Sequence, residues 1–129
     1  KSFGVLDELD SICTSEEIIS AQKLLDTCNA SEAVCAYIAD IAAATRSHAA
    51  VKLGLSTRGA VALKRMSAAI AMTQGRDYIM PQDVASAAPY VIKHRLICRG
   101  YTVTGGLDRT ADEVIRQILD SVAVPTEQI

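Results

Sequence analysis

The sequence predicts an all-α fold in which five helices pack into one compact domain. Apolar residues recur at three- and four-residue spacing over most of the chain, which is the period of one helix face. At two places a hydroxyl residue stands three positions before a carboxylate, the arrangement that caps the start of a helix. The 129 residues include no Trp and one Phe, so the core must be built from Ala, Ile, Val and Leu, which suits closely packed helices.

The first two helices are predicted from their caps and their apolar spacing. Thr14 and Glu17 form a capping-box pair, so a first helix should cover about 15–28. Its buried stripe should consist of Ile18, Ala21, Leu25 and Cys28. Ser31 can cap a second helix that ends near Ser47. Its buried face should contain Val34, Ile38, Ile41, Ala42 and Thr45.

A long third helix is predicted after a loop at 48–55. Ser56 or Thr57 can cap it, and Gly75 should end it in the left-handed conformation that glycine favours. Several alanines let a neighbouring helix approach closely. The buried edge should be formed by Leu63, Met66, Ile70 and Thr73.

The last third of the chain predicts two more helices with an extended element between them. Pro81 suits the first turn of a fourth helix that runs to about His94, and Pro89 predicts a kink or an early break inside it. Alternating side chains near 96–104 allow a short strand or extended arm. Thr110 should cap a final helix. Its apolar residues are Val114, Ile115, Ile118 and Leu119.

Charge is distributed unevenly along the chain. Residues 1–40 carry eight acids and two bases, whereas residues 41–76 carry six bases and no acid. An all-basic middle in an acidic protein implies that some anionic surface faces it. That surface is either an external ligand or the acidic first helix packed beside it, and the sequence leaves both open.

Other classes of site receive little support. The four cysteines form no C-x-x-C pair and have no histidine at metal-finger spacing, so we expect free thiols and no metal site. No Ser/His/Asp or Cys/His arrangement is recognisable. No apolar run approaches the roughly 18 residues of a membrane span, so we expect a soluble, cytoplasmic protein.

Residues 54–59 have the glycine spacing of a phosphate-binding P-loop but do not form one. Ala60 and Val61 stand where a P-loop needs Lys and then Ser or Thr to reach the phosphates and magnesium. No other segment supplies the motif. The chain alone therefore has no visible means of hydrolysing a nucleotide.

The same segment is nevertheless a candidate phosphate receptor. Arg58 lies in the first turn of the third helix, where a cation is disfavoured by up to about 1 kcal/mol unless an anion meets it. Free amides, the hydroxyls of Ser56 and Thr57 and the guanidinium of Arg58 would converge on such an anion. The alternative is an Arg58 side chain that points into solvent, and composition alone favours this alternative.

Three segments, in their order and spacing, resemble the lid domain of MoxR-family AAA+ ATPases. They are residues 51–60, which contain Leu55-Ser56-Thr57-Arg58, residues 75–84, which begin Gly75-Arg76-Asp77-Tyr78, and the triplet His94-Arg95-Leu96. Residues 37–46 and 114–125 also resemble the family. The resemblance therefore covers nearly the whole chain from Ser15 onward.

The resemblance implies a role for each part of the chain. Residues 15–129 would form the lid, and residues 1–14 would be a linker from an AAA+ core. Arg58 would be the sensor-2 arginine, which reaches the terminal phosphate of ATP held with Mg²⁺ by that core, with Ser56 and Thr57 beside it. Met80, where a helix-capping hydroxyl is usual, and Gly59, where Ala is common, depart from the family pattern and put local stability in doubt.

The family also implies an assembly and a task for the whole ATPase. Its members form rings, typically hexamers, in which neighbouring subunits meet. They act as chaperone-like remodellers in complex maturation or cofactor insertion. Their usual partners contain von Willebrand factor A domains.

Two other classes of function remain open on the sequence. One is a free-standing helical adaptor that binds proteins, and the other is a helical module that binds nucleic acid through the basic middle. The basic segment lacks interleaved aromatic residues and a groove-reading motif, so we expect only weak, nonspecific DNA binding. Steep salt dependence would favour the nucleic-acid module.

The isolated chain is expected to fold as a helical domain that neither binds ATP tightly nor hydrolyses it. One arginine cannot replace a P-loop and a magnesium site. Circular dichroism and a phosphate-release assay measure the two properties. Turnover that persists through purification and is absent from a mock preparation would contradict the prediction.

Overall fold

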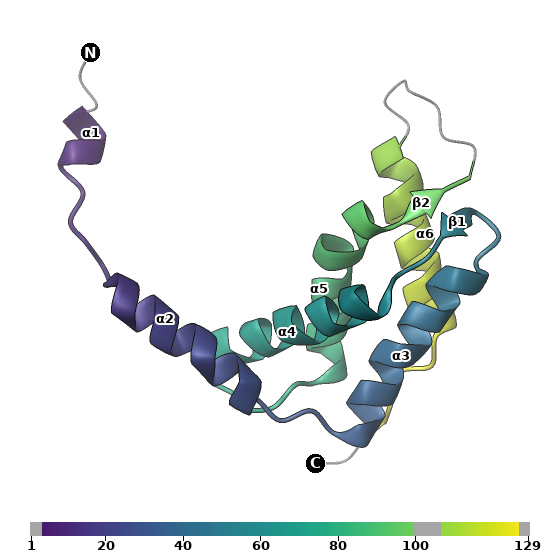
Figure 1. The fold of residues 1–129 in the computed structure, drawn as a ribbon, viewed down its shortest axis with the longest axis horizontal. Helices are drawn as coiled ribbons and strands as arrows, with labels where there is room; N and C mark the ends of the chain where they lie inside the picture. Colours follow the sequence, from purple (N-terminus) through teal and green to yellow (C-terminus); the bar gives the residue numbers. More distant parts are fainter. Residues whose placement is uncertain (1–3, 100–106, 127–129) are drawn as a thin grey trace.

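A computed structural model describes residues 4–99 and 107–126 and confirms the predicted, mostly helical fold. Its elements in chain order are α1 (Gly4–Asp7), α2 (Ser15–Leu24), η1 (Leu25–Thr27), α3 (Glu32–Ser47), β1 (Val51–Leu53), α4 (Thr57–Thr73), α5 (Pro81–Ile92), η2 (Lys93–Arg95), β2 (Ile97–Cys98) and α6 (Leu107–Ser121). Figure 1 shows α3 to α6 gathered into a bundle from which α2 and α1 extend. Within the described residues, no helix is both long and apolar enough to cross a bilayer.

The core lies between α3, α4, α5 and α6 and is built from aliphatic side chains, as the composition predicts. Its largest fully buried apolar side chains are Ile41, Leu55, Leu63, Ile92, Ile118, Val34 and Val84. Burying each of these side chains contributes about 1.5–3 kcal/mol. The small residues Ala68, Ala71, Ala87 and Ala88 are also buried, so α4 and α5 can pack closely.

Helix α3 agrees with its prediction in both its cap and its buried face. The Ser31 hydroxyl accepts a hydrogen bond from the Val34 amide at 3.1 Å, which caps the helix start. The predicted residues Val34, Ile38, Ile41, Ala42 and Thr45 are all buried. Thr45 is the unusual member of this face, because a buried hydroxyl requires hydrogen-bond partners.

Helix α2 has the predicted cap but not the predicted buried stripe. Thr14 and Glu17 form the reciprocal capping box, with both hydrogen bonds at 3.1 Å. The helix stops at Leu24, however, and none of its residues is buried; Ile18 is 51% exposed. Apolar spacing identifies which helix face is apolar, but it does not show whether a neighbour covers that face. Of the predicted stripe, only Cys28, beyond the helix, is buried.

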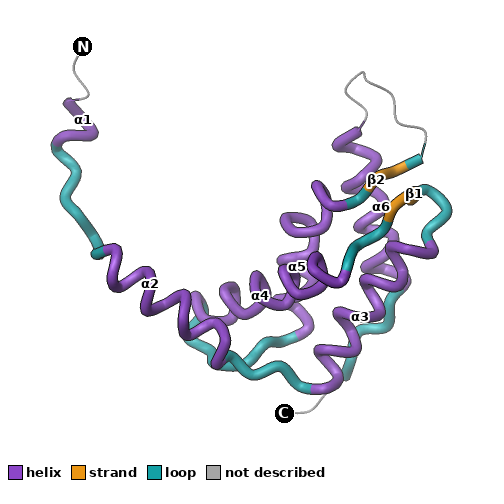
Figure 2. The backbone as a smooth tube through the Cα atoms, viewed as in Figure 1, coloured by secondary structure: helices purple, strands orange, loops and turns teal. Residues whose placement is uncertain are grey.

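A two-stranded antiparallel sheet closes one end of the bundle. Strand β1 pairs with β2, with Val51 opposite Cys98 and Leu53 opposite Ile97. Figure 2 shows the two short strands side by side beyond the start of α4. The extended element predicted near 96–104 is present as β2, whereas residues 100–106 lie outside the described residues. The loop prediction for 48–55 is wrong at β1, because three residues are too few to show alternation and the pairing partner lies far along the sequence.

Helix α4 buries a different face from the predicted one. Leu63 is buried, but Met66 is 41% exposed, Ile70 is half-buried and Thr73 is exposed. The residues buried on α4 are Gly59, Leu63, Ser67, Ala68 and Ala71. The prediction placed the large apolar residues of α4 on the buried face. The face that packs closely against α5 consists mainly of small residues instead. The left-handed Gly75 is confirmed by its φ of 77°.

Helices α5 and α6 differ from their predictions at one point each. Helix α5 begins at Pro81 as predicted but continues through Pro89 to Ile92, so the predicted break is wrong. Four buried residues around Pro89, namely Ala87, Ala88, Val91 and Ile92, hold this turn in the core and offset the hydrogen bond that proline cannot make. Helix α6 begins at Leu107, so Thr110 lies inside it rather than capping it. Val114, Ile115 and Ile118 are buried as predicted, and Leu119 is half-buried.

A buried ion pair joins the end of α4 to the start of α5. Arg76 Nη2 and Nη1 donate to the two carboxylate oxygens of Asp83 at 2.7 and 2.8 Å, and Arg76 Nη1 also donates to the Tyr78 carbonyl. Asp83 Oδ2 accepts from the Met80 amide at 2.7 Å. The Met80 side chain makes no capping hydrogen bond, but Asp83 satisfies the helix start from three residues away. Asp83 thus accepts from the helix-start amide, although Met80 has no capping hydroxyl.

The environment of Asp83 favours its charged form. Burial by itself raises the pKa of Asp83, since the residue is only 3% exposed. Hydrogen bonds from Arg76 and the Met80 amide, with the positive charge of Arg76, outweigh burial and hold the pKa below its ordinary value. A carboxyl with a lowered folded-state pKa stabilises the fold above its unfolded pKa, and this stabilisation is lost as the pH falls.

The Asp83→Asn variant is expected to lose about 3 kcal/mol of unfolding free energy at pH 7, because it leaves Arg76 without its buried partner. The loss should shrink as the pH falls from about 4, the ordinary pKa of an Asp carboxyl in the unfolded chain, toward the lowered pKa of Asp83 in the folded protein. Urea denaturation between pH 3 and pH 7 measures both effects. Asp112→Asn is the matched control, because Asp112 pairs with Lys93 at the surface and such pairs contribute less than about 1 kcal/mol. Equal losses in the two variants would contradict a structural role for the buried pair.

Candidate functional site

The start of α4 is the candidate site, and its cap is Ser56. The Ser56 hydroxyl accepts a hydrogen bond from the Gly59 amide at 3.1 Å. Because Ser56 performs this task, Thr57 is the first residue of the helix and its side chain is exposed. The amides of the first turn point out of the helix end, where an anion can accept from them.

Arg58 carries an exposed positive charge at this positive helix end. No acidic residue lies in the first turn of α4. Arg58 makes no ion pair or side-chain hydrogen bond with any residue in 4–99 or 111–126. The ion pairs found in those ranges use Arg65, Arg76, Lys93 and Arg116 instead. Arg58 therefore has the exposure and the uncompensated charge that an external anion would require.

The turn that carries Arg58 is fixed to the end of α3 by what we call the Leu55 clamp, formed by Thr45, Arg46 and the backbone of Leu55. The Leu55 amide donates to Thr45 Oγ1 at 2.8 Å, and Arg46 Nε donates to the Leu55 carbonyl at 3.0 Å. The Thr45 hydroxyl in turn donates to the Ala42 carbonyl at 2.6 Å. Thr45 and the Leu55 side chain are both fully buried. Both backbone groups of the residue before the cap are thus held by one neighbouring helix.

Two glycines make this close approach possible. A Cβ on Gly54 would lie 2.7 Å from Arg46 Cγ and 2.8 Å from its backbone. A Cβ on Gly59 would meet the buried side chain of Leu55, 2.9 Å from its Cγ. Gly59 departs from the family pattern for a structural reason. Because glycine has no side chain, Leu55 can lie under the first turn of α4.

The structure brings some predicted site residues together and adds others. Ser56, Thr57 and Arg58 share one turn as predicted, although the lone pairs of Ser56 already serve its own helix. Sequence reasoning missed Thr45 and Arg46 as supports for this turn. A signal was available for Thr45, because a hydroxyl predicted on a buried face must find partners.

The basic middle of the chain meets the acidic amino-terminal part at one described contact. Asp26 in η1 pairs with Arg65 in α4 at 3.0 Å, and both side chains are largely exposed. Such a surface pair contributes less than about 1 kcal/mol. It leaves the exposed Arg58, about two turns earlier in the same helix, unaffected, so the internal explanation for the basic segment accounts for only part of that segment.

The cysteines and histidines form no second centre in the described residues. Cys28 and Cys98 are buried thiols, and burial raises the pKa of each. Cys13 and Cys35 are exposed and free. The side chains described in 4–99 and 111–126 include no group of three or more His, Cys, Asp or Glu placed to bind a metal.

The chain was compared with known proteins by sequence and by structure. A profile of the AAA lid domain matches residues 43–118. Over 123 residues the chain is 30% identical to YeaC, an uncharacterised protein of Bacillus subtilis, covering 95% of this chain and 38% of YeaC. Over 80 residues it is 35% identical to the chaperone MoxR1 of Mycobacterium tuberculosis, covering 58% of this chain and 19% of MoxR1.

A solved structure supports the fold. The crystal structure of a protein from Cytophaga hutchinsonii, proposed to be an ATPase, superposes with a TM-score of 0.72 at 23% identity. The superposition covers 86% of this chain and 36% of that one. At this identity the likeness establishes the fold alone. The chain spans less than two fifths of the length of each of these three proteins.

The Thr45→Val variant is expected to lose about 1–3 kcal/mol of unfolding free energy, because the buried Leu55 amide is left without an acceptor. Thr73→Val is the matched control, since the Thr73 hydroxyl donates to the Ile70 carbonyl three residues back, as Thr45 does to Ala42, but Thr73 is exposed. Chemical denaturation measures both, and Thr45→Ser should recover most of the loss. Equal destabilisation by the two valines would mean that the bond to Leu55 contributes nothing.

Proposed function

This chain belongs to the AAA lid domain family and is of the MoxR type, and we propose that Arg58 is its sensor-2 arginine, which contacts the terminal phosphate of ATP held by a preceding core domain. The observation that carries the proposal is the exposed, uncompensated charge of Arg58 in the first turn of α4. A phosphate placed there would meet a guanidinium and the outward-pointing amides of the helix end.

The donor chemistry of the turn fits a phosphate. Thr57 is exposed, and the Ser56 hydroxyl, whose oxygen accepts from Gly59, still has a proton to donate. No acid lies in the turn to repel the anion. In the whole ATPase, the P-loop of the core would hold ATP and Mg²⁺, and the magnesium would neutralise charge on the phosphates. The lid would add a cation without supplying a metal ligand.

The Leu55 clamp suggests how a phosphate contact would affect the whole lid. Because the turn is held to α3 through two hydrogen bonds and tight glycine contacts, a force on Arg58 is transmitted to the bundle. Loss of the terminal phosphate would remove the attraction at the same point. The angle between the lid and the core would then follow the nucleotide state, which is a rigid-body form of coupling.

The remaining parts of the chain take roles that follow from the lid assignment. We propose that residues 1–14, which are exposed wherever they are described, lead from the core to a lid formed by residues 15–129. The parent would assemble as a ring, typically a hexamer, in which lids meet neighbouring subunits. Its task would be chaperone-like remodelling with a partner that contains a von Willebrand factor A domain, in keeping with the similarity to the chaperone MoxR1.

Arg58→Ala in the full-length parent is expected to lower ATP turnover by about 10²- to 10³-fold, the usual effect of removing one donor that stabilises transition-state charge. Its unfolding free energy should change by less than about 0.5 kcal/mol, because an exposed first-turn side chain makes few core contacts. Lys64→Ala is the control, since it removes an exposed charge further along the same helix. Steady-state turnover and thermal melting separate the two effects. Normal turnover in Arg58→Ala would leave this residue a solvated surface arginine.

A further inference from the structure

A second arginine from a different element lies at the same turn. Arg95 belongs to η2, which follows α5, and its Cδ atom is 3.4 Å from the place a Cβ on Gly59 would occupy. The aliphatic part of Arg95 therefore lies against the bare backbone of the residue that follows Arg58. Arg95 belongs to the His94-Arg95-Leu96 triplet, to which the proposed function assigns no task.

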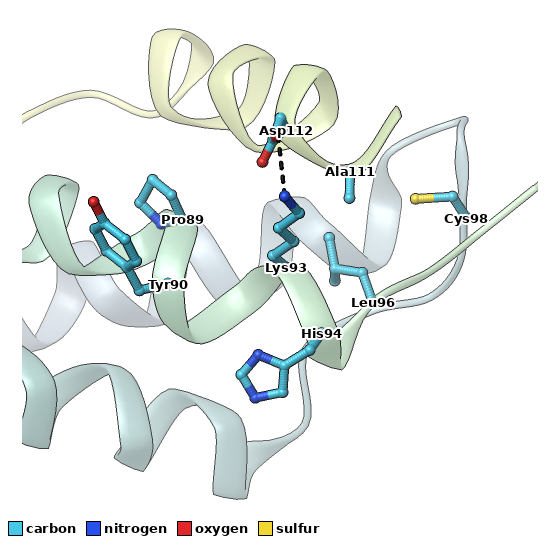
Figure 3. A pocket seen from close by; sticks show the side chains of 8 residues that line it. All are labelled: Pro89, Tyr90, Lys93, His94, Leu96, Cys98, Ala111 and Asp112. Carbon is cyan, nitrogen blue, oxygen red and sulfur yellow. Dashed lines mark hydrogen bonds and ion pairs between the residues drawn. The ribbon is translucent and has the colours of Figure 1, made fainter. Parts of the chain in front are cut away.

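Lys93 and His94, which precede Arg95 in η2, point in opposite directions. Figure 3 shows Lys93 directed at Asp112 on α6 and the His94 ring on the opposite side of η2, toward α4. Lys93 and Asp112 pair at 3.2 Å, so the charge of Asp112 is already paired. A 3₁₀ turn of three residues directs each side chain about 120° from the last, which separates Arg95 from the Lys93 pair. Arg95 is exposed and makes no ion pair or side-chain hydrogen bond within 4–99 or 111–126.

We propose that Arg95 is a second phosphate-contacting residue of the lid, because its stem lies against Gly59, the residue that follows Arg58. The proposal rests on the proposed function of Arg58. The stem of Arg95 lies at the positive helix end that also carries Arg58, and no described acid is paired with either arginine. Arginine donors from two directions suit the several oxygens of a terminal phosphate.

Gly59 lies between the buried Leu55 and the stem of Arg95. A Cβ there would lie too close to the Leu55 side chain, 2.9 Å from its Cγ, whereas 3.4 Å from Arg95 Cδ is an ordinary van der Waals contact. Leu55 therefore requires glycine at this position, and the stem of Arg95 lies beside it.

The test uses the full-length parent and substitutions that separate charge from packing. Arg95→Met keeps an aliphatic stem over Gly59 but removes the guanidinium, and Arg95→Lys keeps the charge without the two-pronged donor. Lys52→Met is the control, because Lys52 is an exposed cation on β1. For each variant kcat, the KM for ATP and the melting temperature are measured beside those of Arg58→Ala.

Arg95→Met is expected to lower kcat/KM for ATP about ten- to hundredfold, the range for losing a hydrogen bond to a charged group. Arg95→Lys should recover part of the loss, while Lys52→Met and all melting temperatures stay near wild type. A normal kcat/KM in Arg95→Met beside a defective Arg58→Ala would overturn the role of Arg95 and leave that of Arg58 intact. Normal values in both variants would overturn both proposals. A loss of activity in Arg95→Met that matches a loss of melting temperature would assign Arg95 a structural role instead.

Discussion

Both backbone groups of Leu55 are held by the last turn of α3, through the Thr45 hydroxyl and the Arg46 guanidinium, and the geometry of the candidate site depends on these two bonds. Leu55 precedes the cap of α4, so its position sets where the helix starts and where Arg58 emerges. Each bond contributes only about 1 kcal/mol net, but an unpaired buried amide would cost about 1–3 kcal/mol. The cost of leaving the Leu55 amide unpaired and the close contacts of Gly54 and Gly59 together keep the turn in one place.

Helix α4 extends from the candidate site to the contacts with η1 and α5. Arg58 stands at its first turn, whereas the Asp26–Arg65 pair joins its middle to η1, where the exposed α2 leads away (Figure 1). Seventeen residues of helix span about 25 Å, and most of that length separates Arg58 from the far end of α4. The buried Arg76–Asp83 pair fixes the far end of α4 to α5. Helix α4 is thus held near both ends, by the Leu55 clamp and by the Arg76–Asp83 pair.

Features determined by residues close in sequence were predictable, and features determined by distant partners were not. The caps at Thr14 and Ser31, the left-handed Gly75 and the proline start of α5 each follow from local chemistry. Strand β1 and the exposure of α2 depend on what lies across space, which apolar spacing does not report. At the candidate site, the helix dipole and the family resemblance pointed to Arg58 as the site residue. Arg95 was not predicted as a site residue. It lies 37 residues after Arg58 and 36 after Gly59 in the sequence, and it reaches the same turn only because α5 packs on α4.

The most direct test of the sensor-2 role is a structure of the full-length parent bound to Mg²⁺ and a nonhydrolysable ATP analogue. The guanidinium of Arg58 is expected within hydrogen-bond distance, about 2.7–3.0 Å, of an oxygen on the terminal phosphate. The Leu55 clamp should be unchanged, because the lid moves as a body. A closed, nucleotide-bound subunit in which Arg58 points into solvent, with the start of α4 turned away from the phosphates, would contradict the assignment.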